Sequence, residues 1–405
     1  MTDAAALLVT AKELDEADPL AGYRDRFVPA GGVSAYLDGN SLGRPLLATA
    51  AHLQEFVTRD WGERLIRGWD EQWLELPSAI GDRLGRAALG AAPGQCIVAD
   101  STTVLLYKLA RAGVAARSGR DEILMDADNF PTDRYVLEGI ARECGLTLRW
   151  VEAGYDGGVR VEDVAAAAGP RTALAVFSHV AYRSGYLADA AAITAAVHDA
   201  GGLVLWDLCH SAGAVPAELD AWGVDYAVGC SYKYLNGGPG APAWGYVASR
   251  HQADFAQPIQ GWLGSQDPFG MAQGYVPADG IRRLVSGTPP ILGMLAMQDM
   301  ISLIEEAGMG AVRAKSTALT EYAVSAVDAL LAPRGVVLAS PRDPDRRGSH
   351  ITIDHPAFRE VTAALWTRGV IPDYRNPNGI RLGLSPLSTS FTETFTGIEA
   401  VLAAL

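Results

Sequence analysis

The sequence predicts an α/β protein with a large domain built on about seven mainly parallel strands and a smaller α+β domain at the C-terminus. Three observations predict this fold. From about residue 80, short apolar runs alternate with stretches of helical spacing, the pattern of βα units. Polar residues follow the ends of these runs. Beyond residue 290, long amphipathic runs lead instead to short strands. The length of 405 residues also exceeds that of a usual single domain.

The expected elements follow in chain order. Residues 1–30 predict a short helix and an irregular lead-in. The strands of the large sheet are expected at 96–99, 122–125, 146–151, 174–178, 203–206, 226–229 and 244–247, with helices such as 104–115 and 190–200 between them. After them we expect helices at 291–307 and 310–332, strands at 336–339 and 349–353, a helix at 357–368, a strand at 380–384 and a terminal helix. We divide the chain into an N-terminal segment (1–60) that packs with the small domain, a large domain (61–290) and a small domain (291–405).

Composition excludes several classes of partner. The formal charge of −14 and the lack of a basic run argue against nucleic acid and membrane surfaces. No apolar stretch is long enough to span a bilayer, and the first residues lack the features of a signal peptide. The four cysteines show no metal-ligand spacing, so we expect no metal and a reduced, cytoplasmic protein. Cys209 and Cys230 are treated as packing residues.

Lys233 is the first candidate for chemistry. It lies in residues 231–240, SYKYLNGGPG, which follow an apolar run and contain a glycine-rich breaker. This pattern predicts a strand end that opens into a tight loop. Desolvation there lowers the pKa of a lysine towards the neutral amine that forms imines. A solvated loop lysine is the plain alternative.

Asp207 favours the chemical interpretation of Lys233. It ends the apolar run 203–206, so its carboxylate should lie at the carboxyl edge of a parallel sheet, where open α/β folds bind ligands. Pyridoxal phosphate enzymes need such a pair. A lysine holds the cofactor as an imine, and an acid keeps the pyridine nitrogen protonated, so that the ring acts as an electron sink.

Further polar loops are expected at the same edge. Thr102 and Thr103 follow the first strand and open a helix, which suits a phosphate but is equally explained by an ordinary helix cap. Phe130 could stack on a planar cofactor or cover the core. Ser184 lies in the polar stretch 178–185 after the fourth strand. No dinucleotide fingerprint or P-loop occurs, so a nucleotide cofactor is not expected.

Two segments upstream of the sheet fit either a structural role or a place in a ligand site. Residues 38–43, DGNSLG, specify a tightly turned loop, and the side chains of Asn40 and Ser41 could point at water or into a site. Residues 61–73 contain three tryptophans, including Trp69. Aromatics at this density usually mark a core or a subunit interface, and less often a slot for an aromatic ligand.

Five of these segments together resemble the kynureninase family, which consists of fold-type-I pyridoxal phosphate enzymes. The segments are DGNSLG (38–43), LIRGW (65–69), FPTD (130–133), DLCHSAG (207–213) and SYKYLNGGPG (231–240). The resemblance runs from about residue 36 to the C-terminus. Its one departure is Cys209, which stands where the family motif has alanine and leaves the polar residues in place.

The resemblance implies roles for individual residues. Lys233 is expected to hold the cofactor, Asp207 to pair with its pyridinium nitrogen and Tyr232 to relay protons and contact the phosphate. Arg381 would grip the substrate's α-carboxylate with a bidentate fork, and Trp69 would lie near the aromatic ring. Further cofactor contacts are expected from Thr102, Thr103, Phe130, Thr132, Ser184 and His210, with Trp262 and Thr288 from a neighbouring subunit, and substrate contacts from Asn40 and Ser41.

The activity that the resemblance implies is hydrolysis of L-kynurenine to anthranilate and L-alanine, in tryptophan degradation, by a homodimer with shared active sites. The 3-hydroxy form of the substrate remains open. A cysteine desulfurase or selenocysteine lyase would need a catalytic cysteine in the C-terminal half, and the chain has none after Cys230. A silent pyridoxal-binding protein would not need Lys233, Asp207, Tyr232 and Arg381 together.

Overall fold

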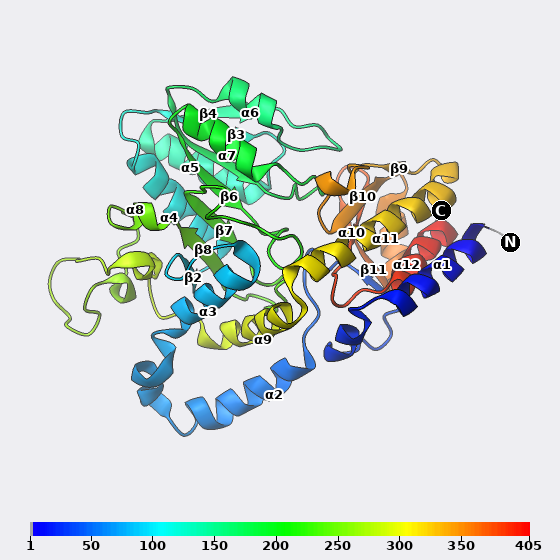
Figure 1. Cartoon of the computed structure of the whole chain (residues 1–405), viewed down its shortest axis with the longest axis horizontal. Coiled ribbons are helices and arrows are strands. Elements are labelled where there is room, and N and C mark those ends of the chain that lie inside the picture. The colour runs from blue at the N-terminus through cyan, green and yellow to red at the C-terminus, as the bar shows by residue number, and fades with distance from the viewer. Residues whose placement is uncertain (1–2) are drawn as a thin grey trace.

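The structure, a computed structural model, describes residues 3–405 and contains a seven-stranded sheet (Figure 1). The strand order is β2-β8-β7-β6-β5-β3-β4, and all neighbours are parallel except the two pairs that β8 makes. The strands are β2 (Cys96–Ala99), β3 (Glu122–Asp126), β4 (Thr147–Val151), β5 (Thr172–Ser178), β6 (Leu203–Asp207), β7 (Tyr226–Gly229) and β8 (Ala243–Val247). All seven predicted strands are present, which confirms the predicted fold class.

Helices cover both faces of this sheet. On one face, Leu105 and Leu109 of α4 pack with Val176, Leu205 and Val228. On the other face, the helix α7 packs against Val204 and Trp206. The helices of this part are α2 (Leu47–Glu55), α3 (Leu76–Leu84), α4 (Thr102–Ala115), α5 (Pro131–Cys144), α6 (Val161–Ala167), α7 (Ala190–Asp199), α8 (Ser249–Gln252) and α9 (Ile291–Ala307). Because neither face meets water, the central strands are apolar throughout instead of alternating.

A second sheet has five strands in the order β1-β11-β12-β10-β9. They are β1 (Ala35–Leu37), β9 (Val337–Leu338), β10 (His350–Asp354), β11 (Val370–Arg375) and β12 (Gly379–Gly383). The helices α1 (Asp3–Ala17), α10 (Met309–Ala326), α11 (Phe358–Thr367) and α12 (Phe391–Ala404) accompany it. Figure 1 shows α1 and α12 together at one end of the molecule, beside both termini.

The sequence did not reveal two strands of the smaller sheet. The strand β11 contains a proline and two charged residues, and β1 has only three residues, which pair with β11 from more than 330 positions away. Neither has the apolar run or strict alternation from which a strand is predicted. The division of the chain at residues 60 and 290 stays a prediction.

The loop after β5 connects the two sheets at the carboxyl edge of the large one. The backbone oxygen of Tyr182 accepts a hydrogen bond from Arg381 of β12, and that of Arg183 accepts one from Thr352 of β10. The smaller sheet therefore closes over the edge at which β6 and β7 end. None of the described helices is long and apolar enough to cross a membrane. The first two positions of the stretch without signal-peptide features lie outside the described residues.

Candidate active site

Lys233 lies in a tight loop directly after β7. The loop closes on itself, because the Gly237 N–H donates to the Ser231 oxygen at 2.8 Å and the Asn236 N–H donates to the Lys233 oxygen at 3.0 Å. The side chain of Lys233 is buried, with 9% exposed. Its Nζ lies 3.3 Å from Nε2 and 3.5 Å from Nδ1 of His210, and within residues 3–405 it pairs with no carboxylate. The loop thus holds a buried amine that is free to react.

None of the other three lysines of the chain offers a buried amine without an ion pair. Lys108 is fully buried and pairs with Asp100 at 2.5 Å, while it also donates to the Leu284 oxygen. Lys315 of α10 is buried and pairs with Asp18. Lys12 lies on the exposed face of α1. Lys233 is therefore the one candidate for a covalent cofactor link.

Asp207 ends β6, as the sequence predicted, and is buried beside the Lys233 loop. One carboxylate oxygen accepts the Cys209 N–H at 2.7 Å. Its other oxygen has no hydrogen-bond partner among the described residues. Cys209 and Cys230 contact each other behind this carboxylate, where the Cys230 N–H lies 3.2 Å from the Cys209 sulfur. Asp207 consequently presents one open oxygen to the crevice.

Asp133 is a second carboxyl at this place, and sequence reasoning gave it no role. It lies in the first turn of α5, is buried, and has one oxygen without a partner. Burial, with the nearby charges of Asp207 and Asp126, raises its pKa well above the usual range, whereas Lys233 acts in the opposite direction. An acid in the first turn of a helix is typical of any helix, so the sequence carried no specific signal for it.

The rings of Phe130 and His210 lie close to the Lys233 amine. The Phe130 ring centre is 5.9 Å from Nζ and meets the Tyr182 ring edge-on at 5.3 Å. The imidazole of His210 contacts that of His350 at 5.5 Å between ring centres, with the planes tilted by 51°. His350 is a buried residue that the sequence did not single out, and its two ring nitrogens have no hydrogen-bond partner. Burial, Arg381 and Lys233 lower the pKa of His350 to about 3. Burial and Lys233 likewise lower the pKa of His210, so both rings stay neutral.

The DGNSLG loop packs directly on the Lys233 loop. The Gly43 N–H donates to the Tyr232 oxygen at 2.8 Å, and a Cβ at Gly43 would collide with the backbone oxygen of Lys233. Asn40 is fully buried against Gly383, with both side-chain polar atoms unpaired. The Ser41 hydroxyl accepts a hydrogen bond from Arg381 at 3.0 Å. The loop therefore points into the site rather than at water.

Arg381 lies on β12, is almost fully buried, and faces the same crevice. Its positive charge is among the causes that lower the pKa of both His210 and His350. Its guanidinium donates to Asp373, to the Tyr182 oxygen and to Ser41. Three segments that are distant in the sequence thus meet at one place: residues 38–43, 207–233 and 379–383.

The residues expected at a phosphate lie at helix starts. Thr102 and Thr103 open α4, whose first turn is capped by Ser101 at 3.4 Å from the Val104 N–H. Thr132 lies in the first turn of α5. Tyr232 is half-buried, with its ring centre 5.9 Å from Lys233 Nζ, and burial raises its pKa. These positions stay predictions for phosphate contacts.

Four expected residues are not brought to Lys233 within this chain. The Ser184 hydroxyl donates to the Gly157 oxygen at 2.5 Å, so it serves the loop itself. Trp69 meets Trp73 edge-on at 5.3 Å, beside a cluster that contains Phe56 and Leu295. Trp262 and Thr288 are exposed. The Ser184 hydroxyl is thus not free for a cofactor, and the other three side chains would reach a site only across a subunit interface.

The arrangement fits pyridoxal phosphate. The buried, unpaired amine of Lys233 suits the aldehyde of the cofactor. The open carboxylate oxygen of Asp207 suits its ring nitrogen, and the ring of Phe130 suits its ring plane. Unpaired buried polar atoms of Asp133, Asn40 and His350 around the crevice also indicate a missing polar ligand, because such atoms are normally satisfied. The accessible start of α4 suits an anion.

Comparison with known proteins agrees with this geometry. The family model described as the kynureninase C-terminal domain matches residues 312–401. A kynureninase from Burkholderia pseudomallei (strain 1106a) is 41% identical over 396 residues, which cover 96% of this chain and 93% of that protein. The chain belongs to the kynureninase family. A kynureninase from Pseudomonas fluorescens is 39% identical over 393 residues, 95% of this chain and 92% of that protein.

Membership of the kynureninase family makes the chain a pyridoxal phosphate-dependent hydrolase. Solved structures show the fold. An apo cysteine desulfurase from Thermococcus onnurineus NA1 superimposes with a TM-score of 0.79 at 18% identity, over 90% of this chain and 94% of that one. A mutant of C-DES with glycine linked to its pyridoxal phosphate superimposes with a TM-score of 0.82 at 16% identity, over 93% and 98%.

Proposed function

We propose that the site around Lys233 catalyses hydrolytic Cβ–Cγ cleavage of L-kynurenine, or of its 3-hydroxy form, to anthranilate or 3-hydroxyanthranilate and L-alanine. The observation that carries this proposal is the meeting of the DGNSLG loop, Asp207 and Arg381 at the one lysine that is buried without an ion pair. The relatives named kynureninase support the choice of substrate. The pathway would be tryptophan degradation.

The proposed roles follow from what each side chain can hold. When bound, pyridoxal phosphate stabilises negative charge that develops at the substrate's α-carbon. Asp207 keeps a proton at the ring nitrogen with its open carboxylate oxygen. Lys233 Nζ takes the proton from the α-carbon, and Tyr232 passes protons between the lysine and the substrate. Arg381 holds the α-carboxylate, which fixes the substrate along the crevice.

The neutral histidines beside Lys233 are part of the same proposal. Burial and the charge of Lys233 hold the pKa of His210 well below its usual range, so the ring does not add a positive charge beside the lysine and is too weak a base to take the α-proton in place of the lysine amine. The position of His210, 3.3 Å from Nζ, lets it steady the amine between the steps of the reaction. The surrounding residues are buried, which limits water to the molecule that the hydrolysis consumes.

A steady-state assay tests the proposed function directly. Purified protein with bound cofactor should release anthranilate and L-alanine in equal amounts from L-kynurenine. The parallel assay with 3-hydroxykynurenine gives the ratio of kcat/KM for the two substrates and thereby assigns the preference. If neither substrate is cleaved while the cofactor is bound, the proposed function is wrong.

Asp207→Asn is expected to bind the cofactor yet lose at least ~10²-fold in kcat, the scale of removing a catalytic group. Asparagine keeps the shape and can still accept the Cys209 N–H, but it lacks the charge that holds the ring nitrogen protonated. The measurement is kcat together with the visible absorbance of the bound cofactor. Asp328→Asn, which removes a carboxylate from a surface pair with Arg342, serves as control. Near-normal kcat in Asp207→Asn would refute this role.

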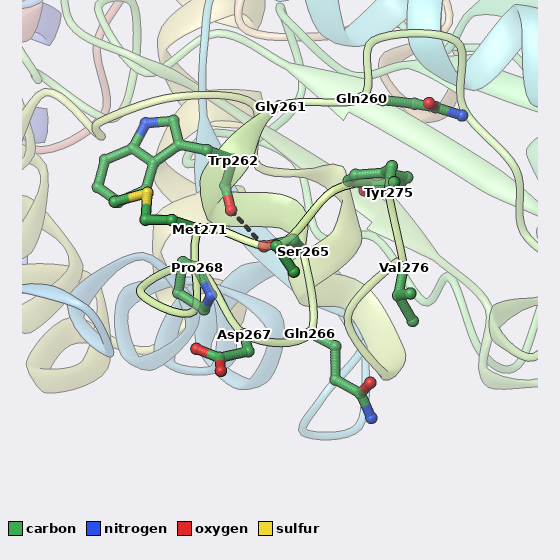
Figure 2. Close-up of a pocket in the computed structure, with 12 residues that line it drawn as sticks. Gln260, Gly261, Trp262, Ser265, Gln266, Asp267, Pro268, Met271, Tyr275 and Val276 are labelled. Atoms are coloured by element: carbon green, nitrogen blue, oxygen red, sulfur yellow. Dashed lines mark hydrogen bonds between the residues drawn. The ribbon is translucent and has the colours of Figure 1, made fainter.

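We also propose a homodimer in which Trp262 and Thr288 reach the neighbouring subunit's site. Trp262 lies at a hollow of about 540 Å³ and packs near Met271, as Figure 2 shows. Trp262, Phe269, Met271 and Val276 are all more than 40% exposed, an apolar surface that a lone subunit rarely leaves uncovered. Sedimentation should then give twice the mass of the 42.8 kDa chain. A cytoplasmic location belongs to the same proposal and is supported by four free cysteines.

Trp69→Ala distinguishes an aromatic-ring contact from a purely structural role. If Trp69 meets the substrate ring across the subunit interface, the substitution weakens kynurenine and anthranilate by about 1–3 kcal/mol and leaves L-alanine almost unchanged. Titration of the cofactor absorbance with each ligand gives the three constants. Equal weakening of alanine and kynurenine would instead assign Trp69 to packing with Trp73, the contact that the chain itself makes.

A further inference from the structure

The guanidinium of Arg381 is already occupied by an internal carboxylate. Its Nε donates to Asp373 Oδ2 at 2.6 Å, and its Nη2 contacts the same oxygen. Nη2 also donates to Ser41, and Nη1 donates to the Tyr182 oxygen at 2.6 Å. A guanidinium has five N–H groups. With four of them engaged, the two-point fork expected for a substrate carboxylate is used by Asp373 instead.

Asp373 has a second possible partner, the guanidinium of Arg375. It is the direct cross-strand partner of Arg381, since β11 and β12 pair these two residues. Its Oδ2 also accepts from Arg375 Nε at 2.8 Å. The side chain of Asp373 is 15% exposed and that of Arg375 is 37% exposed, so this second pair lies on the solvent side of the cluster. A small rotation of Asp373 towards Arg375 would free the fork without leaving a carboxylate unpaired.

The charge around Arg381 favours such an exchange. Asp38 faces the same cluster but accepts no hydrogen bond from Arg381. Burial foremost, together with the charge of Asp373, raises the pKa of Asp38 to about 6, although Ser41 and the two guanidinium groups act in the opposite direction. Two acids thus already face two guanidinium groups. A further carboxylate at Arg381 would lie beside Asp373 on one desolvated guanidinium, unless Asp373 turns towards Arg375, which is more exposed to water.

We propose that Asp373 is an internal competitor, which occupies the fork of Arg381 in the free enzyme and moves to Arg375 when the substrate's α-carboxylate binds. Asp373 thereby sets the affinity for amino-acid ligands and disfavours anions that cannot displace it. The proposal rests on the function proposed above, because it assumes that the α-carboxylate binds at Arg381.

Asp373→Asn is the direct test. An asparagine fills the same space but is a weak, neutral competitor, so we expect L-alanine to bind about tenfold more tightly, which corresponds to roughly 1.4 kcal/mol. The measurement is titration of the cofactor absorbance of the holoenzyme at pH 8, where Asp38 is ionised. Kynuramine, the decarboxylated analogue of kynurenine, should bind the variant and the unsubstituted protein equally, because it has no carboxylate to compete with Asp373.

Two controls separate competition from general electrostatics. Asp38→Asn removes a negative charge from the same cluster without freeing the fork, and should tighten L-alanine binding less than Asp373→Asn. In an Arg381→Ala background, Asp373→Asn should have no effect on L-alanine, because no fork remains to compete for. An effect of equal size in the Arg381→Ala background would assign the change to charge alone and overturn the proposal.

Unchanged or weaker binding of L-alanine to Asp373→Asn would also overturn the proposal. Asp373 would then orient Arg381 rather than compete with the substrate carboxylate for it. If that variant fails to retain cofactor, Arg375→Gln decides. Without Arg375, Asp373 stays on Arg381, so L-alanine should bind more weakly and kynuramine as before, whereas unchanged alanine binding contradicts the exchange. If the unsubstituted protein does not respond to kynurenine or L-alanine, the proposed function fails instead.

Discussion

Lys233→Ala is expected to lose at least ~10⁴-fold in kcat, because one substitution removes both the covalent link to the cofactor and the base for the α-proton. Lys233 is buried beside His210 and has no ion pair to break, so its truncation leaves no buried charge unpaired. The fold should therefore persist, with the thermal midpoint close to that of the unsubstituted protein. Single-turnover kinetics with kynurenine measures the loss.

Peptide mapping identifies the linked lysine independently of activity. Borohydride reduction of the unsubstituted holoenzyme should fix the cofactor on the peptide that contains Lys233 and change its absorbance irreversibly. Lys12→Ala, at an exposed position of α1, is the matched control and should behave as the unsubstituted protein. An adduct on Lys108 or Lys315 would overturn the assignment of the site, even though both are held in buried ion pairs.

Arg381→Ala is expected to weaken L-alanine and kynurenine together, by about 2–5 kcal/mol, the range for removing one partner of a buried charge-assisted pair. Both ligands carry the α-carboxylate, whereas only kynurenine has the aromatic ring. The affinities for L-alanine and for kynurenine should thus fall by similar factors, whereas Trp69→Ala should lower only the affinity for kynurenine. Titration of the cofactor absorbance measures both.

Kynuramine and a surface arginine provide the controls for Arg381. Kynuramine lacks the α-carboxylate and should bind Arg381→Ala as it binds the unsubstituted protein. Arg342→Ala breaks a two-point pair with Asp328 on the surface and should change none of the constants. If kynuramine weakened as much as L-alanine, Arg381 would stabilise the contact between β12 and the loop at Tyr182 rather than bind the carboxylate.

Much of the large sheet and the centre of the site could be predicted because the signals are local. Strand ends such as Asp207 are visible where an apolar run stops at a charged residue, and the parallel order of β5, β6 and β7 then brings their ends to one edge. The glycines after Lys233 predict a tight loop, which the structure confirms. These features depend on a few neighbouring residues and on general rules of sheet topology.

Other parts of the site depend on contacts between distant segments. Asn40 could face water or the site, and only its burial against Gly383 decides this. Asp133 looked like an ordinary first-turn acid until the packing of α5 placed it near Asp207 and Lys233. His350 lies in a strand whose sequence contains no catalytic pattern, yet the closure of the smaller sheet brings its ring into contact with His210.

By itself, the sequence determined the class of fold, the strand ends that carry Asp207 and Lys233, and the kind of cofactor that such a pair holds. The tertiary structure alone decided which lysine is free, because ion pairs at Lys108 and Lys315 are made with residues 8 and 297 positions away. It also decided that Asp373 occupies Arg381, since strand register pairs these residues across β11 and β12. Pairing and burial are properties of the folded chain, and no local pattern encodes which charges will meet.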